Sequence, residues 1–271
     1  MREVAVLGIG QTRIDEHWDK SLRLLAGEAI FAAMQDAGVE RVESFYIGNM
    51  MSGSANFQQH LGAYIADWVG SRFSESLRIE AACSSGAAAF RSGVMAVASG
   101  EVDVVVAAGV EKMTDSPAGE ITAHLATAAD ADWEVDQRVS FVAINAVVMQ
   151  RYMHEYGWQK DDFAQFSINA HANGSKNPYA RFQSPITLKV YQRAAMISDP
   201  INLFDASPMG DGAAAVVLVP ASSLQNNGSK PIIRVLGSGA ATDTIDVASR
   251  PRPVWLTAAE LSVNQAYRQA G

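Results

Sequence analysis

The chain contains 271 residues, of which 48% are hydrophobic, and it carries a formal net charge of −8 at pH 7. A chain of this size can bury a substantial core as one large domain or as one domain with an appendage. The acidic balance argues against a nucleic-acid-binding protein, and the sequence has no run of about 18 apolar residues to span a bilayer. A single cysteine excludes an internal disulfide and a cysteine-based metal site, and the five histidines show no metal-type spacing. We therefore expect a soluble cytoplasmic protein that holds no metal and binds neither nucleic acid nor a membrane.

Strands and helices alternate in the first 111 residues. Residues 102–110, Val-Asp-Val-Val-Val-Ala-Ala-Gly-Val, form a continuous apolar run, which is typical of a parallel strand covered on both faces. Amphipathic runs that end at Gly38, Gly70 and Gly100 predict helices, because glycine is a common helix stop. The predicted strands cover 3–8, 43–48, 77–82 and 102–110, and the predicted helices cover 21–37, 58–69 and 84–99. This alternation indicates a layered α/β fold.

The pattern changes at about residue 112. The next stretch contains predicted helices over 139–156 and 161–172, separated by polar loops, and few convincing strands. Strand character returns at 213–219. The expected organisation is a sheet domain formed by 1–111 and 200–220, with a loop domain inserted at 112–199.

A weak internal repeat links the two ends of the chain. Residues 4–10, Val-Ala-Val-Leu-Gly-Ile-Gly, recur at 233–239 as Ile-Arg-Val-Leu-Gly-Ser-Gly, and each copy precedes a predicted helix that ends in Ala-Gly, at Gly38 and Gly271. A chance recurrence is the alternative, because short matches are weak. Interpreted as a repeat, residues 231–271 form the incomplete start of a second half, most of which the chain lacks.

Cys83 is the first candidate functional residue. It lies in residues 79–89, Ile-Glu-Ala-Ala-Cys-Ser-Ser-Gly-Ala-Ala-Ala, which we interpret as a strand end, a sharp turn and the start of a helix of small residues. A thiol at such a helix start meets free backbone N–H groups and the positive end of the helix dipole, which favour the thiolate. This setting suits a nucleophile. The alternative is an inert thiol buried beneath the alanine-rich helix.

Four ordered motifs resemble the thiolase superfamily. Residues 80–86, Glu-Ala-Ala-Cys-Ser-Ser-Gly, resemble the nucleophile turn of that family, and 109–113, Gly-Val-Glu-Lys-Met, resemble the strand end after its nucleophile helix. Residues 177–180, Asn-Pro-Tyr-Ala, and 205–214, Asp-Ala-Ser-Pro-Met-Gly-Asp-Gly-Ala-Ala, resemble its archaeal and sterol-carrier-associated branches. β-Ketoacyl synthases share the Ala-Cys-Ser-Ser core, but the second motif and the long insertion favour thiolase. The resemblance implies a layered α/β/α fold with a loop domain inserted in the first of two similar halves.

The resemblance also implies an activity. In thiolases a cysteine, here Cys83, accepts an acyl group from acyl-CoA, and either a Claisen condensation with a second acyl-CoA or thiolysis of a 3-ketoacyl-CoA occurs. The Gly-His-Pro and Cys-x-Gly motifs that activate the cysteine and move protons belong to the second half of the family fold and are absent from this sequence. We therefore expect an acetyl-CoA C-acyltransferase that is impaired in this short chain. The alternatives are a non-catalytic thiolase-like subunit that binds acyl-CoA or a partner protein, and a thiolase-like aldolase, whose relatives do not depend on this cysteine.

The expected ligands are coenzyme A thioesters, bound as substrates and not as a permanent cofactor. Residues 163–198 contain no Asp or Glu, and in an acidic protein this basic stretch suits CoA phosphates; a merely solvated basic face is the alternative. The four candidates are Lys176, Arg181, Lys189 and Arg193. By resemblance we also expect a homodimer or homotetramer, and association with small OB-fold, zinc-ribbon acyl-CoA-binding proteins.

Overall fold

The computed structural model describes residues 2–224 and 231–271. By its internal contacts the chain divides into two compact units. The first consists of Met1–Ser116, Gly210–Ser238 and Gln265–Gly271, and the second consists of Pro117–Met209 and Gly239–Asn264. Within the described ranges, no helix is long and apolar enough to cross a membrane.

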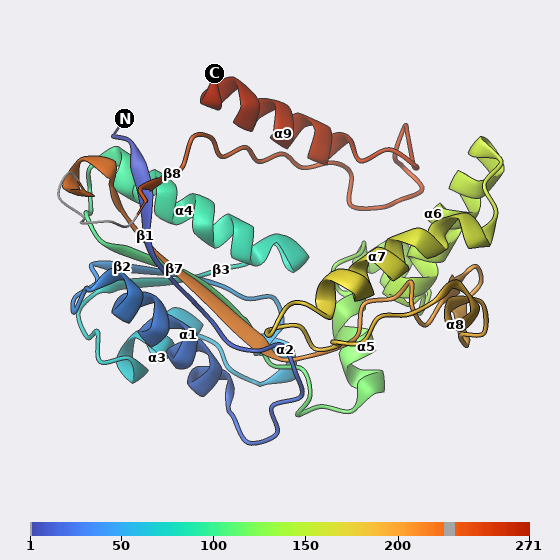
Figure 1. The fold of residues 1–271 in the computed structure, drawn as a ribbon, viewed down its shortest axis with the longest axis horizontal. Helices are drawn as coiled ribbons and strands as arrows, with labels where there is room; N and C mark the ends of the chain where they lie inside the picture. The colour runs from blue at the N-terminus through green and yellow to red at the C-terminus, as the bar shows by residue number, and fades with distance from the viewer. Residues whose placement is uncertain (1, 225–230) are drawn as a thin grey trace. The chain divides into compact units, whose positions relative to one another are not determined.

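A six-stranded mixed sheet forms the centre of the first unit (Figure 1). Its strands, in spatial order, are β3 (Glu75–Ile79), β2 (Ser44–Gly48), β4 (Val105–Glu111), β7 (Gly212–Pro220), β1 (Val4–Gln11) and β8 (Ile233–Arg234). β2 runs parallel to β3 and β4, whereas β7 runs antiparallel to both β4 and β1. The strand predicted at 102–110 starts later than predicted, at Val105, and has a parallel neighbour on one side only. The chain re-enters the sheet at the edge where β4 ends, so that Glu111 pairs with Gly212.

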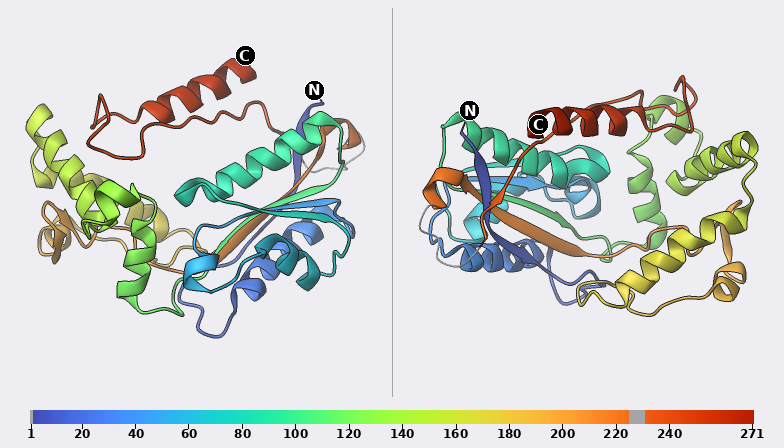
Figure 2. Two further views of the ribbon diagram at one scale, coloured as in Figure 1. Left: turned by 180° about the vertical axis from the view of Figure 1, so that it is seen from behind. Right: turned by 45° about the horizontal axis from the view of Figure 1, so that its top comes forward.

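Helices cover both faces of this sheet (Figures 1 and 2). α1 (Leu22–Ala37) and α3 (Leu61–Trp68) lie against one face, and α4 (Ser85–Ser99) lies against the other. Val105 and Val106 are neighbours on β4 and belong to opposite buried clusters, as the alternation of side chains along a strand requires. The cluster under α1 and α3 includes Leu25, Ile30, Phe45 and Ile65, and the cluster under α4 includes Val97 and Leu218. The layer order α/β/α agrees with the prediction.

Element boundaries follow the local signals where these are strong. α1 ends at Gly38, whose φ of 68° lies in the left-handed region that glycine tolerates, and α4 ends in the same way at Gly100. α3 begins later than residue 58, because His60 has a left-handed φ of 56° and stands outside the helix. β3 ends at Ile79 and not at 82, since the chain leaves the sheet there. β1 continues past residue 8, because β7 pairs with it along its whole length. The structure also contains a short helix, α2 (Ser52–Ala55), that the sequence does not predict.

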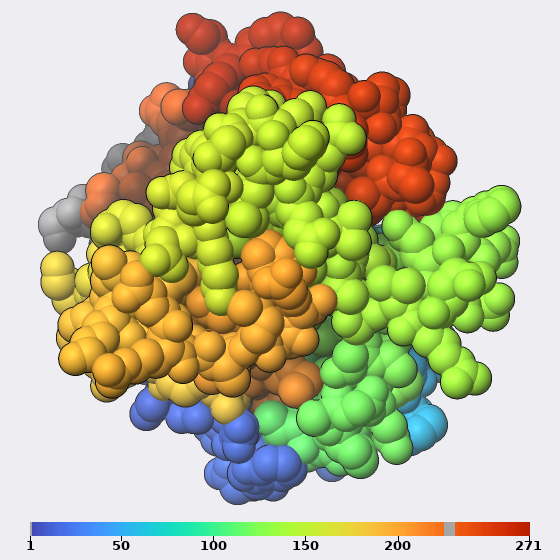
Figure 3. All heavy atoms as spheres, turned by 90° about the vertical axis from the view of Figure 1, so that its right-hand side faces the viewer, coloured from blue at the N-terminus to red at the C-terminus, as the bar shows by residue number. Residues whose placement is uncertain are grey.

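The second unit is mainly helical. It contains α5 (Ala118–Ala126), α6 (Phe141–Tyr156), α7 (Ala164–Gly174), α8 (Leu188–Gln192), a small sheet of β5 (Met196–Ser198) and β6 (Ile201–Asn202), and the start of α9 (Thr257–Ala270). The helices predicted at 139–156 and 161–172 are present as α6 and α7. Ser140 caps α6 by accepting a hydrogen bond from the N–H of Ala143, which explains why the helix starts there. In Figure 3 the surface of this unit runs from α6, in lime, to the orange segment around α8.

The repeat in the sequence has a structural counterpart. Gly8 in β1 packs so closely on α1 that an added Cβ would lie 2.4 Å from the carbonyl oxygen of Ala33. Gly237, which follows β8, packs as closely on α9, where an added Cβ would lie 2.2 Å from the carbonyl oxygen of Ala266. Both alanines lie one turn before the last residue of their helix. The two copies therefore share one close contact between a glycine and a helix, and the repeat stays a prediction.

Candidate active site

Cys83 lies at the carboxyl edge of the parallel strands. β3 ends at Ile79, a 3-10 turn at Ala82–Ser84 follows, and α4 begins at Ser85. Cys83 is exposed, so the alternative of a thiol buried beneath α4 is wrong. Because ligands of open α/β sheets bind outside the carboxyl ends of the strands, this thiol is well placed to meet a substrate.

Gly48 lets α4 begin directly on the sheet. Gly48 ends β2, and an added Cβ there would lie 2.5 Å from the carbonyl oxygen of Ser85 and 2.6 Å from the backbone nitrogen of Gly86. Gly109 in β4 is less restricted, because its added Cβ would lie 3.6 Å from the Cα of Gly86, an ordinary contact distance. A side chain at Gly48 would push the first turn of α4 away from the sheet. The end of β2 therefore sets how far from the sheet the turn that carries Cys83 lies.

Side chains on either side of Cys83 hold the backbone of this turn. The Ser85 residue is 3% exposed, and its hydroxyl accepts a hydrogen bond from the N–H of Ala81 at 2.9 Å and donates one to the carbonyl oxygen of Ala82 at 2.6 Å. The carboxylate of Glu80 accepts a hydrogen bond from the N–H of Ala82 at 2.5 Å. Ala82 has a φ of 48°, in the left-handed region that alanine rarely adopts. Cys83 thus follows a strained residue that two neighbouring side chains hold in place.

A second group of polar residues lies at the ends of the neighbouring strands. Glu111, the last residue of β4, accepts hydrogen bonds from the N–H groups of Met50 and Met51, and Arg78 donates one to the carbonyl oxygen of Met50 at 2.5 Å. Burial raises the pKa of Glu111 above its ordinary value, although the hydrogen bonds from Met50 and Met51 and the charge of Arg78 oppose the rise. The negative charge of Glu80 adds to the rise in this pKa. The loop after β2 is therefore held by one buried carboxyl group and one guanidinium group.

A buried ion pair joins β4 and β7 at the same edge. The Nζ of Lys112 lies 2.8 Å from Oδ2 of Asp211, and the two side chains are 1% and 0% exposed. Asp211 also accepts hydrogen bonds from the hydroxyl of Thr114 at 2.5 Å and from the N–H groups of Met113 at 2.7 Å and His17 at 3.0 Å. Burial by itself would raise the pKa of Asp211, but these bonds hold it at about 2, below the ordinary value of 3.8. Asp211 is therefore held in its charged form by the ammonium group of Lys112 and by these hydrogen bonds.

The four cations predicted to bind CoA phosphates lie in the second unit as two pairs. Lys176 and Arg181 follow α7, and the half-buried Arg181 donates a hydrogen bond to the carbonyl oxygen of Met209. Lys189 lies on α8 and Arg193 directly follows it; both are exposed, and their spacing of four residues places them about one turn apart. The structure therefore brings Lys189 and Arg193 together at the end of α8 and gives Arg181 a structural contact.

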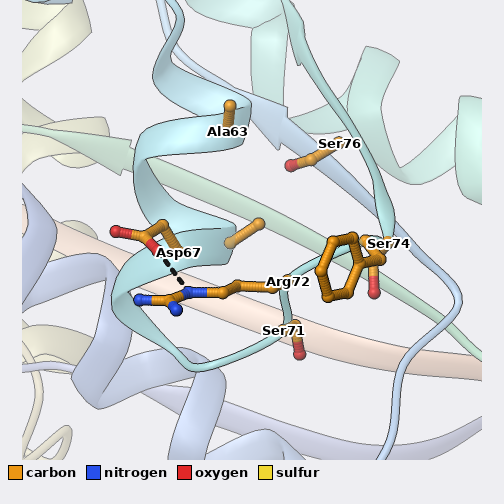
Figure 4. Close-up of a pocket in the computed structure, with 8 residues that line it drawn as sticks. Ala63, Asp67, Ser71, Arg72, Ser74 and Ser76 are labelled. Carbon is orange, nitrogen blue, oxygen red and sulfur yellow. Dashed lines mark hydrogen bonds and ion pairs between the residues drawn. The ribbon is translucent and has the colours of Figure 1, made fainter.

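A hollow of about 280 Å³ lies beside α3 (Figure 4). The Nε of Arg72 donates a hydrogen bond to Oδ1 of Asp67 at 2.9 Å there. The lining consists of Ala63, Ala66, Asp67, Ser71, Arg72, Phe73, Ser74 and Ser76. Since Cys83 is not among these residues, the hollow is separate from the candidate site.

The polar residues at this edge of the sheet are not evident as a group from the sequence. Their positions at the ends of the parallel strands identify them once the strand boundaries are known. Asn49 and Glu80 directly follow β2 and β3, and Glu111 ends β4. Because the carboxyl ends of parallel strands meet at one edge of the sheet, polar residues at these three positions are candidates for a common site.

The fold and this edge define a layered α/β protein with an exposed cysteine at the start of a helix that covers the sheet. Residues 4–222 match the family described as "Thiolase, N-terminal domain". The chain belongs to the thiolase family, which confirms the resemblance of the motifs. Over its whole length it is 42% identical to the acetyl-CoA acetyltransferase of Methanothermobacter thermautotrophicus, of which it covers 70%. It is 38% identical to that of Methanocaldococcus jannaschii, of which it covers 69%.

A solved structure gives the same assignment of the fold. The "Ltp2-ChsH2(DUF35) aldolase" matches with a TM-score of 0.78 and 25% sequence identity, over 99% of this chain and 70% of that one. This similarity confirms the predicted layered architecture. The chain thus spans about 70% of the length of these relatives.

Proposed function

We propose that this chain takes part in thiolase-type acyl transfer and that Cys83 is the acyl acceptor. The observation that carries the proposal is the exposed thiol at the start of α4, in a chain 42% identical to an acetyl-CoA acetyltransferase. In the proposed step the Sγ atom of Cys83 attacks the carbonyl carbon of an acyl-CoA thioester. A new carbon–sulfur bond forms, the bond to coenzyme A breaks, and the departing CoA thiolate takes up the proton that Cys83 loses.

The second step of the reaction needs more than this thiol. A Claisen condensation with a second acyl-CoA, or thiolysis of a 3-ketoacyl-CoA, needs a base and a proton donor. The Gly-His-Pro and Cys-x-Gly motifs that supply these groups by resemblance are absent from the 271 residues. Loss of one oxyanion-hole donor alone costs ~100- to 1000-fold in rate. We therefore propose slow acylation and impaired turnover for these residues on their own.

Labelling with iodoacetamide tests the proposal. The thiol of Cys83 should react, and acetyl-CoA should slow the reaction by occupying or acylating the same atom. ATP at the same concentration is the matched control, because it carries phosphates and an adenosine but no thioester. Labelling that acetyl-CoA leaves unchanged would favour the alternative, a non-catalytic thiolase-like subunit that binds a partner protein.

We further propose that the cations of the second unit bind the phosphates of coenzyme A. The support is that Lys189 and Arg193 are both exposed, about one turn apart at the end of α8, in a stretch without acidic residues that also holds Lys176 and Arg181. Lys189→Glu should weaken CoA binding in isothermal titration calorimetry, most clearly at low salt. Arg151→Glu is the matched control, since Arg151 already forms an ion pair within α6. Equal CoA affinities of the two variants would indicate a solvated basic face.

An aldolase is the second candidate function. It is favoured by the TM-score of 0.78 with the Ltp2-ChsH2(DUF35) aldolase. Cleavage of a 3-hydroxyacyl-CoA that persists in a Cys83→Ala variant would identify this function. We also propose that the chain associates with an accessory protein that binds acyl-CoA; the second component in that printed name, ChsH2(DUF35), supports the existence of a partner. We propose a homodimer or homotetramer as well, and light scattering would check it.

A further inference from the structure

Ser85 is buried beside the proposed nucleophile and touches the two residues that precede it. We infer that Ser85 is a positioning residue: its hydroxyl locks the left-handed backbone of Ala82 and thereby sets the position of the Cys83 thiol. The inference rests on the proposed function, since the position of the thiol matters for the reaction only if the thiol reacts.

A single hydroxyl group uses both of its hydrogen-bonding modes on consecutive residues. Ser85 Oγ accepts from the N–H of Ala81 at 2.9 Å and donates to the carbonyl oxygen of Ala82 at 2.6 Å. The two bonded groups stand at opposite ends of the Ala81–Ala82 pair, so the hydroxyl restrains the backbone dihedrals between them. Because Ser85 is only 3% exposed, water does not readily replace either bond.

The restrained residue adopts a conformation that it would not choose alone. Ala82 has a φ of 48°, where its Cβ crowds the carbonyl oxygen, and such residues persist only where the surroundings hold them. The N–H of Ala82 also bonds to the carboxylate of Glu80, but Glu80 is exposed and open to competition from water. Without the Ser85 hydroxyl we expect Ala82 to relax toward negative φ. Cys83, the next residue, would then move away from the start of α4.

The backbone of Ser85 is itself fixed by the sheet. Its carbonyl oxygen lies so close to Gly48 that an added Cβ would approach it to 2.5 Å. The contact chain therefore runs from the end of β2 through Ser85 to Ala82 and then to Cys83. The Ser85 hydroxyl therefore fixes the exposed turn that carries Cys83 relative to the end of β2.

Alkylation kinetics of the full chain test this inference, with iodoacetamide as the probe and mass spectrometry as the readout. Ser85→Ala should lower the second-order rate constant for Cys83 about five- to tenfold, because one restraining group with two hydrogen bonds is lost. Ser92→Ala is the matched control, since Ser92 lies on the same helix and its hydroxyl donates a hydrogen bond within that helix, to the carbonyl oxygen of Ala88. This variant should react at the wild-type rate.

A second substitution separates positioning from a general loss of structure. Glycine adopts positive φ without penalty, so Ala82→Gly should hold the turn without help from the hydroxyl. In that background Ser85→Ala should lower the alkylation rate about twofold or less, whereas loss of folding would lower it in both backgrounds. The inference would be overturned if the single Ser85→Ala variant reacted at the wild-type rate. It would also be overturned if Ser85→Ala lowered the rate as much in the Ala82→Gly background as in the wild type.

The same samples keep the proposed function and the inference apart. Incubation of the wild-type chain with acetyl-CoA scores acyl transfer, whereas iodoacetamide scores only the presentation of the thiol. A missing acetyl adduct together with slow alkylation of Ser85→Ala would reject the proposed function and retain the positioning role. An acetyl adduct on the wild-type chain together with unchanged alkylation of Ser85→Ala would retain the proposed function and reject the positioning role.

Discussion

The two aspartates that pair with Lys112 differ in burial, and this difference predicts very different effects of the same substitution. The Nζ of Lys112 lies 2.8 Å from a carboxylate oxygen of each, but Asp211 is 0% exposed and Asp115 is 50% exposed. Breaking a buried pair by removing one partner costs about 3–5 kcal/mol, whereas an exposed pair contributes about 0–1 kcal/mol. Because Asp115 continues to neutralise Lys112, we expect Asp211→Asn to lose about 3 kcal/mol of unfolding free energy. The matched variant, Asp115→Asn, should lose less than about 1 kcal/mol.

The pH dependence gives a second measure of the same pair. The pKa of Asp211 is about 2 in the fold and 3.8 ordinarily, so the folded state favours the charged carboxylate. A tenfold change in proton affinity is worth about 1.4 kcal/mol, so this difference contributes roughly 2.5 kcal/mol of stability above the ordinary pKa. The contribution is lost as the pH falls from about 4 toward 2. The stability gap between the wild type and Asp211→Asn should therefore narrow by about 1 kcal/mol between pH 7 and pH 3.

Urea unfolding followed by circular dichroism measures both quantities. The wild type, Asp211→Asn and Asp115→Asn are compared at pH 7 and at steps down to pH 3, and the differences between variants cancel the titration of other groups. The reasoning fails if Asp115→Asn costs as much as Asp211→Asn. It also fails if the gap between the wild type and Asp211→Asn stays constant as the pH falls.

Two further substitutions test packing elsewhere in the chain. Gly237→Ala should loosen the end of α9, because the new Cβ would lie 2.2 Å from the carbonyl oxygen of Ala266. The rate of amide hydrogen exchange at 265–270 should therefore rise. Gly119→Ala is the control and should leave this rate unchanged, because its new Cβ meets no neighbour within 4 Å. Tyr191→Phe should cost about 1–2 kcal/mol in urea unfolding, because the fully buried Tyr191 donates a hydrogen bond to a carboxylate at 2.7 Å. Tyr179→Phe, at an exposed residue, should cost almost nothing, and equal costs of the two tyrosine variants would contradict this account.

Local signals explain why much of the fold is predictable from the sequence. The helix that stops at Gly38 and the helix that stops at Gly100 need no partner from elsewhere in the chain to be recognised, because glycine accepts the left-handed conformation of a helix end. The apolar run at 102–110 likewise identifies a buried strand. It does not reveal that β7 lies antiparallel beside it, because strand direction depends on where the chain returns after the residues between them. The mixed character of the sheet is therefore a tertiary property.

The candidate site likewise contains residues that the sequence predicts and residues that only the structure brings together. Cys83 is recognised from its own segment, since strand, turn and small-residue helix are consecutive. The pair of Lys112 and Asp211 joins residues far apart in the sequence, and neither residue signals its partner or its burial. Ser85 is a different case, because its partners are adjacent but the left-handed φ of Ala82 that gives its hydroxyl a role appears only in three dimensions.

The intact mass of the protein after incubation with acetyl-CoA, with Cys83→Ala in parallel, tests the central claim most directly. The exposed thiol at the start of α4 predicts one acetyl adduct on the wild-type chain and none on the variant. Adducts of equal amount on both chains, or no adduct on the wild type, would contradict the assignment of Cys83 as the acyl acceptor.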